Sequence, residues 1–146
     1  MWNKTKQLLT MIIPPFIKPG DKIGIVSTAS RIDREVVRPA IDLLVSLGYE
    51  VIVGKYTFSE FHQYSSPDVE RSSDLQTMLD NPKIKAIICS RGGYGTLRTL
   101  ERINFCKFVK NPKWIIGFSD VTVLHSKLHL LGIASLHGVM PRYFLQ

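Results

Sequence analysis

Cysteine is scarce in this sequence, which contains only Cys89 and Cys106. The two residues show neither the spacing of metal ligands nor that of a disulfide framework. Cys89 lies in an apolar run, which is typical of a buried thiol that packs as a small hydrophobic side chain. Because few disulfides are expected in a reducing compartment, this usage predicts a cytoplasmic protein.

A long hydrophobic run is also absent. The most apolar stretch near the N-terminus, LLTMIIPPFI, contains two adjacent prolines and is too short to span a bilayer. We therefore expect neither a secretory signal nor a membrane partner.

Positive charge is in excess, but it is not concentrated. The chain carries 19 Lys and Arg against 12 Asp and Glu, a formal net charge of +7. These basic residues are scattered and form no dense run, so we do not expect nucleic acid as a partner. A solvated basic surface, or a part of a larger protein whose remainder is acidic, explains the charge equally well.

After a weakly patterned leader at residues 1–18, apolar runs alternate with segments of helical periodicity. The strands are predicted at residues 22–27, 49–54, 85–90, 111–118 and 133–138, and the helices at 33–47, 68–79, 96–103 and 119–131. Gly48 and Gly132 are expected just beyond helix ends. Alternation of this kind predicts an α/β fold, a flavodoxin-like parallel sheet sandwiched by helices.

Ligands in such folds bind beyond the carboxyl ends of the strands, where STAS, SRGGYG and SD follow the first, third and fourth strands. The glycines of SRGGYG would let the backbone approach a ligand or adopt positive φ. Neither a dinucleotide fingerprint nor a P-loop is present, so phosphate binding is disfavoured. A tight turn without chemistry and a loop that offers backbone N–H groups to an oxyanion both remain open.

The GFSD segment admits two interpretations of Ser119. A serine on a sharp strand-to-helix turn can act as a nucleophile, although the match to Gly-x-Ser-x-Gly is only partial. Serine is also a favoured N-cap, and spacing alone favours that interpretation. Asp120 would then lie in the first helical turn, where a negative charge is favourable.

A nucleophilic serine needs a base, and the chain contains four histidines. His125 and His129 share one helix face, but no Glu follows His125, so a metalloprotease helix is not indicated. His62 lies in a loop. His137 ends the last predicted strand, where it would contact a ligand or hold a loop. We expect no metal site.

Four segments in combination resemble the LD-carboxypeptidases. They are GDKIGIVSTAS, the segment from ERSSDLQTML to SRGGYGTLRTLERI, NPKWIIGFSDVTVLH and LHGVM. These serine peptidases trim murein tetrapeptides, and the family includes the microcin C immunity peptidases. The resemblance covers residues 19–141, which leaves 142–146 as the start of a linker. RGGYG followed by GFSD is specific as a pair, whereas either motif alone is weak.

The resemblance implies an α/β domain like that of the class I glutamine amidotransferases, with Ser119 as the nucleophile. The N–H of Asp120 and a second N–H from Gly93 or Gly92, with Gly93 favoured, would form the oxyanion hole. The substrate would be a cytoplasmic murein peptide that loses its terminal D-alanine, and no metal or organic cofactor would be needed.

This sequence departs from the family pattern in two respects. Val139 replaces the proline of a His-Gly-Pro motif, a modest change in a loop. More seriously, the family's catalytic Glu and His belong to a C-terminal domain that these residues do not include. We therefore expect little activity from the chain alone, unless such a domain acts in trans or a homo-oligomer completes the site. The alternatives are a catalytically dead binding module and a flavodoxin-like domain that binds a phosphorylated ligand.

Overall fold

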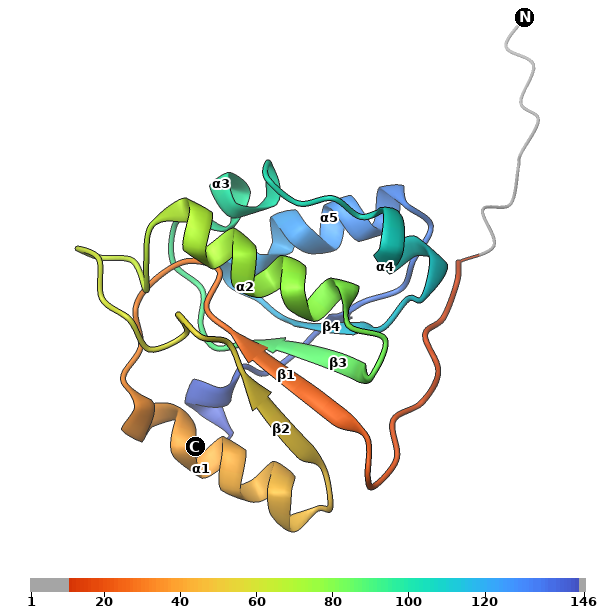
Figure 1. Cartoon of the computed structure of the whole chain (residues 1–146), viewed down its shortest axis with the longest axis horizontal. Coiled ribbons are helices and arrows are strands. Elements are labelled where there is room, and N and C mark those ends of the chain that lie inside the picture. The colour runs from red at the N-terminus through yellow and green to blue at the C-terminus, as the bar shows by residue number, and fades with distance from the viewer. Residues whose placement is uncertain (1–10, 145–146) are drawn as a thin grey trace, which may run out of the picture.

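The computed structural model describes residues 11–144, and a five-stranded parallel sheet forms their centre (Figure 1). The strand order β2-β1-β3-β4-β5 is that of flavodoxin-like folds, which confirms the predicted architecture. Every neighbouring pair is parallel. The strands are β1 (Lys22–Val26), β2 (Glu50–Val53), β3 (Ile84–Cys89), β4 (Trp114–Gly117) and β5 (Leu136–His137).

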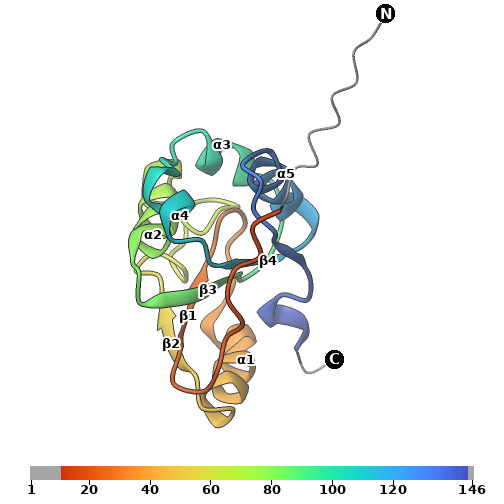
Figure 2. The ribbon, with the colours of Figure 1, turned by 90° about the vertical axis from the view of Figure 1, so that its right-hand side faces the viewer.

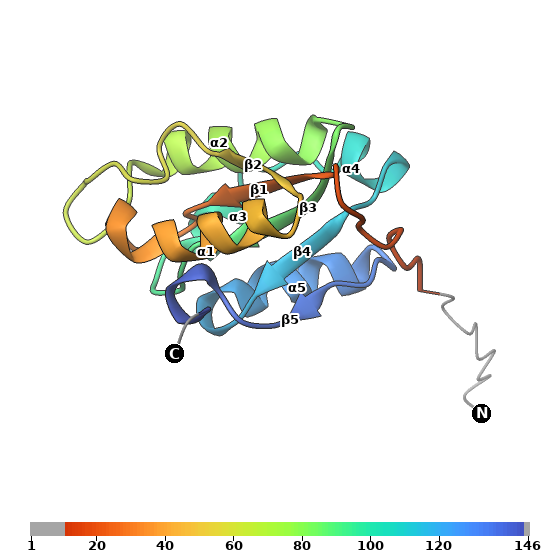
Figure 3. The ribbon, with the colours of Figure 1, turned by 90° about the horizontal axis from the view of Figure 1, so that it is seen from below.

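Helices cover both faces of the sheet (Figures 1 and 3). One face carries α1 (Arg34–Ser46), with the 3₁₀ turn η2 (Pro141–Tyr143) beside it. The opposite face carries α2 (Asp68–Asp80), α3 (Thr96–Leu100), α4 (Cys106–Lys110) and α5 (Thr122–Leu130).

The alternation of side chains along each strand divides the core into two clusters. Ile23 and Ile25 pack with Val37 and Leu44 of α1, whereas Val26 contributes to the cluster on the other face. That second cluster is larger and includes the buried side chains of α2, α4 and α5. Because both faces are buried, the strands had to be apolar in consecutive positions, which is the pattern that predicted them.

Several boundaries differ from the sequence-based prediction. Helix α4 was not predicted, because its five residues are too few to show a 3.6-residue period. The helix predicted at 96–103 ends at Leu100, and the last strand retains only Leu136 and His137. The helix predicted at 119–131 divides into the 3₁₀ turn η1 (Ser119–Val121) and α5. Gly48 and Gly132 have positive φ directly after helix ends, as predicted.

The described end of the predicted leader packs against the domain (Figure 2). The backbone N–H of Ile12 donates to the Gly132 carbonyl over 2.7 Å, and the Trp114 indole donates to the Pro15 carbonyl over 2.9 Å. Residues 1–10 of that leader and 145–146 of the predicted linker lie outside the described residues. Within 11–144, none of the helices has the length and apolar character needed to cross a membrane.

Candidate functional site

The loops that leave β1, β3 and β4 converge at the carboxyl edge of the sheet. Ser27, at the end of β1, and Ser90, at the end of β3, share a buried hydrogen bond with 2.5 Å between their hydroxyl oxygens. Thr28 and Thr96 form a second buried hydroxyl pair at 2.9 Å. These bonds join the STAS segment to the SRGGYG segment and to the first residue of α3, which lie far from it in the sequence.

Ser119 leaves β4 in a left-handed backbone conformation, with a φ of 61°. A non-glycine residue rarely adopts positive φ, and the cost of about 1–3 kcal/mol is typical of functional sites. The side chain is exposed and makes no capping hydrogen bond. The N-cap position of η1 is occupied by Phe118, and Ser119 is the first residue of that turn. The N-cap interpretation of Ser119 is therefore wrong, since a capping residue needs an extended backbone.

The glycine-rich loop packs directly against Ser119. A Cβ placed at Gly92 would lie 3.0 Å from the Ser119 Cβ and 3.1 Å from its Oγ. At Gly93, where φ is 136°, a Cβ would lie 1.9 Å from the Oγ of Ser30. Glycine is required at Gly93, where positive φ and the contact with Ser30 both exclude a side chain, whereas a Cβ at Gly92 would be in tight contact with Ser119.

Asp120 connects the serine turn to the same loop through its side chain. Its carboxylate accepts the backbone N–H of Thr96, the first residue of α3, over 2.9 Å. Its own backbone nitrogen lies 3.5 Å from the position that a Gly92 Cβ would take. The backbone N–H of Asp120 thus lies next to the small space between Gly92 and Ser119.

Arg71 supports the loop from beneath, although the sequence analysis did not identify it. Its side chain is 1% exposed and donates from Nε to the Thr28 carbonyl over 3.1 Å. It also donates to the Ser66 carbonyl and to the Asp68 carboxylate. A Cβ on Gly95 would lie 3.2 Å from one of its nitrogens. Its spacing from the buried Leu75 and Leu79 on α2 was a signal that could have revealed it.

His125 is half-buried and both of its ring nitrogens are engaged. Nε2 lies 2.8 Å from the Gly117 carbonyl, which can only accept, so Nε2 carries the proton. Nδ1 then accepts the hydroxyl of Ser135 over 2.8 Å. Burial lowers the pKa of His125, which favours this neutral form. Because its hydrogen bonds support the end of β4, His125 is not a base poised for Ser119.

The other three histidines are exposed, and the ring centroid of His137 lies 6.1 Å from that of Phe118, the residue before Ser119. His62 is exposed in its loop, and His129 is exposed on α5. His125, His129 and His137 line a pocket of about 610 Å³. Among the described residues no group of His, Cys, Asp and Glu could hold a metal ion, and no histidine is hydrogen-bonded to Ser119.

Cys89 is fully buried at the end of β3, which confirms its predicted packing role. Burial raises the pKa of its thiol to about 12, so the thiol is protonated and unreactive at neutral pH. Ser119 is therefore the nucleophile candidate at this edge. The edge combines an exposed hydroxyl on a strained turn with closely packed backbone N–H groups, an arrangement suited to acyl transfer.

Comparisons with known proteins agree with this geometry. A profile of the LD-carboxypeptidase N-terminal domain matches residues 23–138. A putative carboxypeptidase of Synechocystis is 39% identical over 84% of this chain and 40% of its own length. The probable murein peptide carboxypeptidase of Bacillus subtilis is 34% identical, covering 87% of this chain and 40% of its own length.

Solved structures show the same similarity. A muramoyltetrapeptide carboxypeptidase from Oxalobacter formigenes superposes with a TM-score of 0.74 at 32% identity, covering 82% of this chain and 40% of that one. A microcin C7 self-immunity protein in complex with aspartyl sulfamoyl adenosine gives a TM-score of 0.82 at 25% identity, covering 89% and 39%.

The chain spans about 40% of the length of these two curated relatives. The matched region contains the parallel sheet except for Lys22, the first residue of β1, together with the glycine-rich loop and the strained serine turn. This chain belongs to the LD-carboxypeptidase family and corresponds to its N-terminal domain.

Proposed function

We propose that this chain is the nucleophile-bearing domain of a serine LD-carboxypeptidase, which releases the terminal D-alanine of cytoplasmic murein tetrapeptides. The observation that carries the proposal is the conformation of Ser119. Its φ of 61° places an exposed hydroxyl beside Gly92, at the carboxyl edge of the sheet. Relatives named as murein peptide carboxypeptidases support the substrate class.

In the proposed reaction, Ser119 Oγ attacks the carbonyl carbon of the bond to D-alanine while a histidine accepts its proton. The negative charge that develops on the carbonyl oxygen is stabilised by the backbone N–H of Asp120 and by that of Gly93 or Gly92. Each such donor is worth about 2.7–4 kcal/mol in the transition state.

The intermediate then collapses, and the carbon–nitrogen bond breaks as the histidine returns the proton to the departing amine of D-alanine. Water attacks the resulting acyl-enzyme and gives a proton to the histidine. Breakage of the ester then releases the shortened peptide with a new carboxylate and restores the Ser119 hydroxyl.

We assign the histidine and its orienting glutamate to the C-terminal domain of the family, which acts in a longer chain or in trans. The hydrogen bonds of His125 support this assignment, because both of its ring nitrogens are already used in supporting β4 and the chain before β5. Removing triad partners from a serine hydrolase costs several powers of ten in rate, so the domain alone would be nearly inactive.

The test measures D-alanine release from a murein tetrapeptide by the chain alone and by the chain mixed with the C-terminal domain of the Bacillus subtilis relative. We expect release only from the mixture, and we expect Ser119→Ala to abolish it. Ser126→Ala is the matched control, because Ser126 is exposed on α5 and donates only to the Thr122 carbonyl.

Release that persists in Ser119→Ala would overturn the assignment of the nucleophile. Release by the chain alone, abolished in Ser119→Ala, would place the base within this chain or an oligomer of it. Absence of release from every mixture would count against the carboxypeptidase and favour a binding module without catalytic activity.

A further inference from the structure

Three arginines line a recess beside the start of the glycine-rich loop. The recess has a volume of about 380 Å³, and its lining consists of Arg31, Ile32, Asp33, Val36, Arg91 and Arg142. These residues come from the β1 loop, the start of α1, the glycine-rich loop and η2. Three of these segments, which lie far apart in the sequence, bring guanidinium groups to one concave surface, which we name the arginine recess.

Positive charge exceeds negative charge in the arginine recess. Arg31 pairs with Glu60, and Asp33 adds one carboxylate to the lining. Among the described residues, no carboxylate forms an ion pair with Arg91 or Arg142. The nearby Arg34 lies over the Phe58 ring, with 4.4 Å from its guanidinium carbon to the ring centroid. Guanidinium groups without a carboxylate partner bind carboxylates with paired, charge-assisted hydrogen bonds.

The arginine recess is connected to the serine site by adjacent residues. Arg91 directly precedes Gly92, which packs against Ser119, and Arg31 directly follows Ser30, which packs against Gly93. The Arg91 guanidinium donates to the Arg31 carbonyl over 3.0 Å, which holds its side chain against the β1 loop. In a carboxypeptidase substrate, the terminal carboxylate lies one residue beyond the scissile carbonyl, a separation that an arginine side chain can bridge.

We propose that the arginine recess binds the free C-terminal carboxylate of the peptide, with Arg91 and Arg142 as its principal ligands. This inference rests on the proposed function, since it assumes that the peptide is cleaved at Ser119. It explains how the site would restrict cleavage to the last residue of a chain. An internal peptide bond would place a neutral amide, instead of a carboxylate, beside two cationic side chains.

The test compares the binding of a murein tetrapeptide with that of its C-terminal amide, by calorimetry at fixed salt. The full chain carries Ser119→Ala so that turnover cannot contribute. We expect the free acid to bind about tenfold more tightly than the amide, as a charged hydrogen-bond acceptor implies. Arg91→Gln and Arg142→Gln should each move that ratio towards one.

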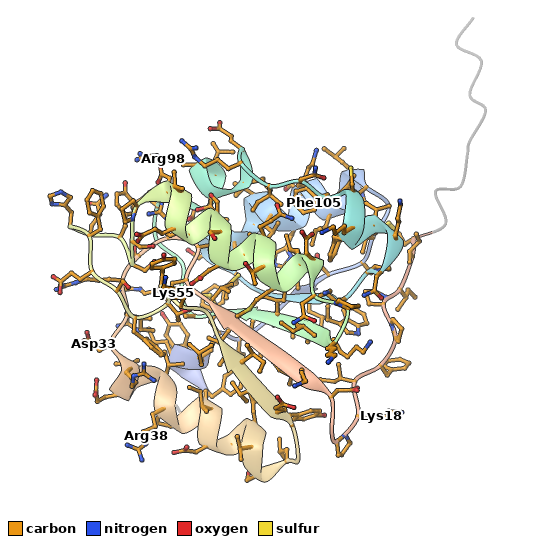
Figure 4. The ribbon with its side chains drawn as sticks, viewed as in Figure 1. Lys18, Asp33, Arg38, Lys55, Arg98 and Phe105 are labelled. Carbon is orange, nitrogen blue, oxygen red and sulfur yellow. The ribbon has the colours of Figure 1, made fainter. Side chains whose placement is uncertain are left out.

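Arg38→Gln is the matched control, because Arg38 lies on α1 outside the arginine recess and pairs with Asp42 across 3.8 Å. Figure 4 shows Asp33 at the start of α1 and Arg38 further along the helix, pointing outward. The control should keep the preference for the acid, and all variants should melt at the wild-type temperature.

Equal binding of acid and amide, or no binding of either, would overturn the arginine recess as a carboxylate site. A preference for the acid that survives in Arg91→Gln combined with Arg142→Gln would overturn it as well. These failures are separable from failure of the proposed function, which is judged by D-alanine release and its dependence on Ser119. Retained preference without any Ser119-dependent release would contradict the proposed function alone.

Discussion

Arg71 and the arginine recess lie close to the same glycine-rich loop, and they use the same side chain in opposite ways. Arg71 is 1% exposed and donates to two carbonyls and a carboxylate, so its charge and its donors are already satisfied. Arg91 lies at the surface of a recess and donates to one carbonyl. The first arginine can only hold the loop, whereas the second retains donors for a ligand.

The difference shows how one edge of a sheet can hold a loop in a fixed conformation and still offer side chains that bind a ligand. A buried, fully hydrogen-bonded network in a low dielectric restricts the loop to one conformation. A partly solvated guanidinium costs little to leave without a carboxylate partner, and so it can exchange water for a ligand. Substitutions of Arg71 and its hydrogen-bond partners should therefore lower the free energy of unfolding, whereas substitutions in the arginine recess should weaken peptide binding.

The largest effect is expected from Arg71→Leu. This change leaves the buried Ser66 carbonyl without its donor, the Thr28 carbonyl with only the Thr99 hydroxyl, and the Asp68 carboxylate without one of its partners. We therefore expect a loss of about 3–5 kcal/mol in the free energy of unfolding. Urea denaturation measures it. Arg98→Leu is the control, because Arg98 pairs with the same Asp68 across 2.7 Å but its side chain is 58% exposed (Figure 4). Its loss should remain below about 1 kcal/mol. Equal losses would contradict the comparison.

Gly93→Ala should have the next largest effect, about 2–4 kcal/mol, because strain at positive φ adds to overpacking against Ser30. Gly20→Ala separates the two contributions. Gly20 also has a positive φ, of 92°, but a Cβ there meets no atom within 4 Å. Its cost should therefore be the strain alone, about 1–2 kcal/mol. Thermal unfolding of both variants provides the measurement. A smaller loss of unfolding free energy in Gly93→Ala than in Gly20→Ala would show that the glycine-rich loop can move to accommodate the added methyl group.

Asp120→Ala should cost about 1 kcal/mol, since it removes the acceptor of the Thr96 N–H at the start of α3. Faster hydrogen exchange at the Thr96 amide would locate the effect. Asp120→Asn keeps an oxygen acceptor and should recover most of the protection. If Asp120→Ala left that amide protected, the carboxylate would not be what holds α3 against the serine turn.

The smallest effect on stability is expected from Arg91→Gln, within about 0.5 kcal/mol, because a surface side chain with one backbone hydrogen bond contributes little. Its consequence should appear in peptide binding instead. A destabilisation comparable to that of Arg71→Leu would mean that Arg91 is a structural residue, and the contrast between the two arginine groups would fail.

Much of the architecture could be predicted from the sequence because each face of the sheet demands apolar side chains from its strands. The runs around Ile25, Ile87 and Ile115 therefore identified three strands, and helical periodicity identified α1 and α2. The same reasoning located GFSD and SRGGYG at the carboxyl edge. Helix α4 was missed and β5 was predicted too long, because elements of five or two residues show no period.

The sequence by itself determined the α/β class, the parallel sheet and the two loops that approach each other at its edge, since these follow from local periodicity. Only the tertiary structure decided the conformation of Ser119, the burial of Arg71 and the assembly of Arg31, Arg91 and Arg142 around one recess. Positive φ at a serine and burial of a charge are locally unfavourable, so local propensity predicts neither, and the helical spacing of Arg71 from Leu75 and Leu79 was the one sequence signal for its burial. They exist because contacts between distant segments, from β1 to η2, outweigh that local cost.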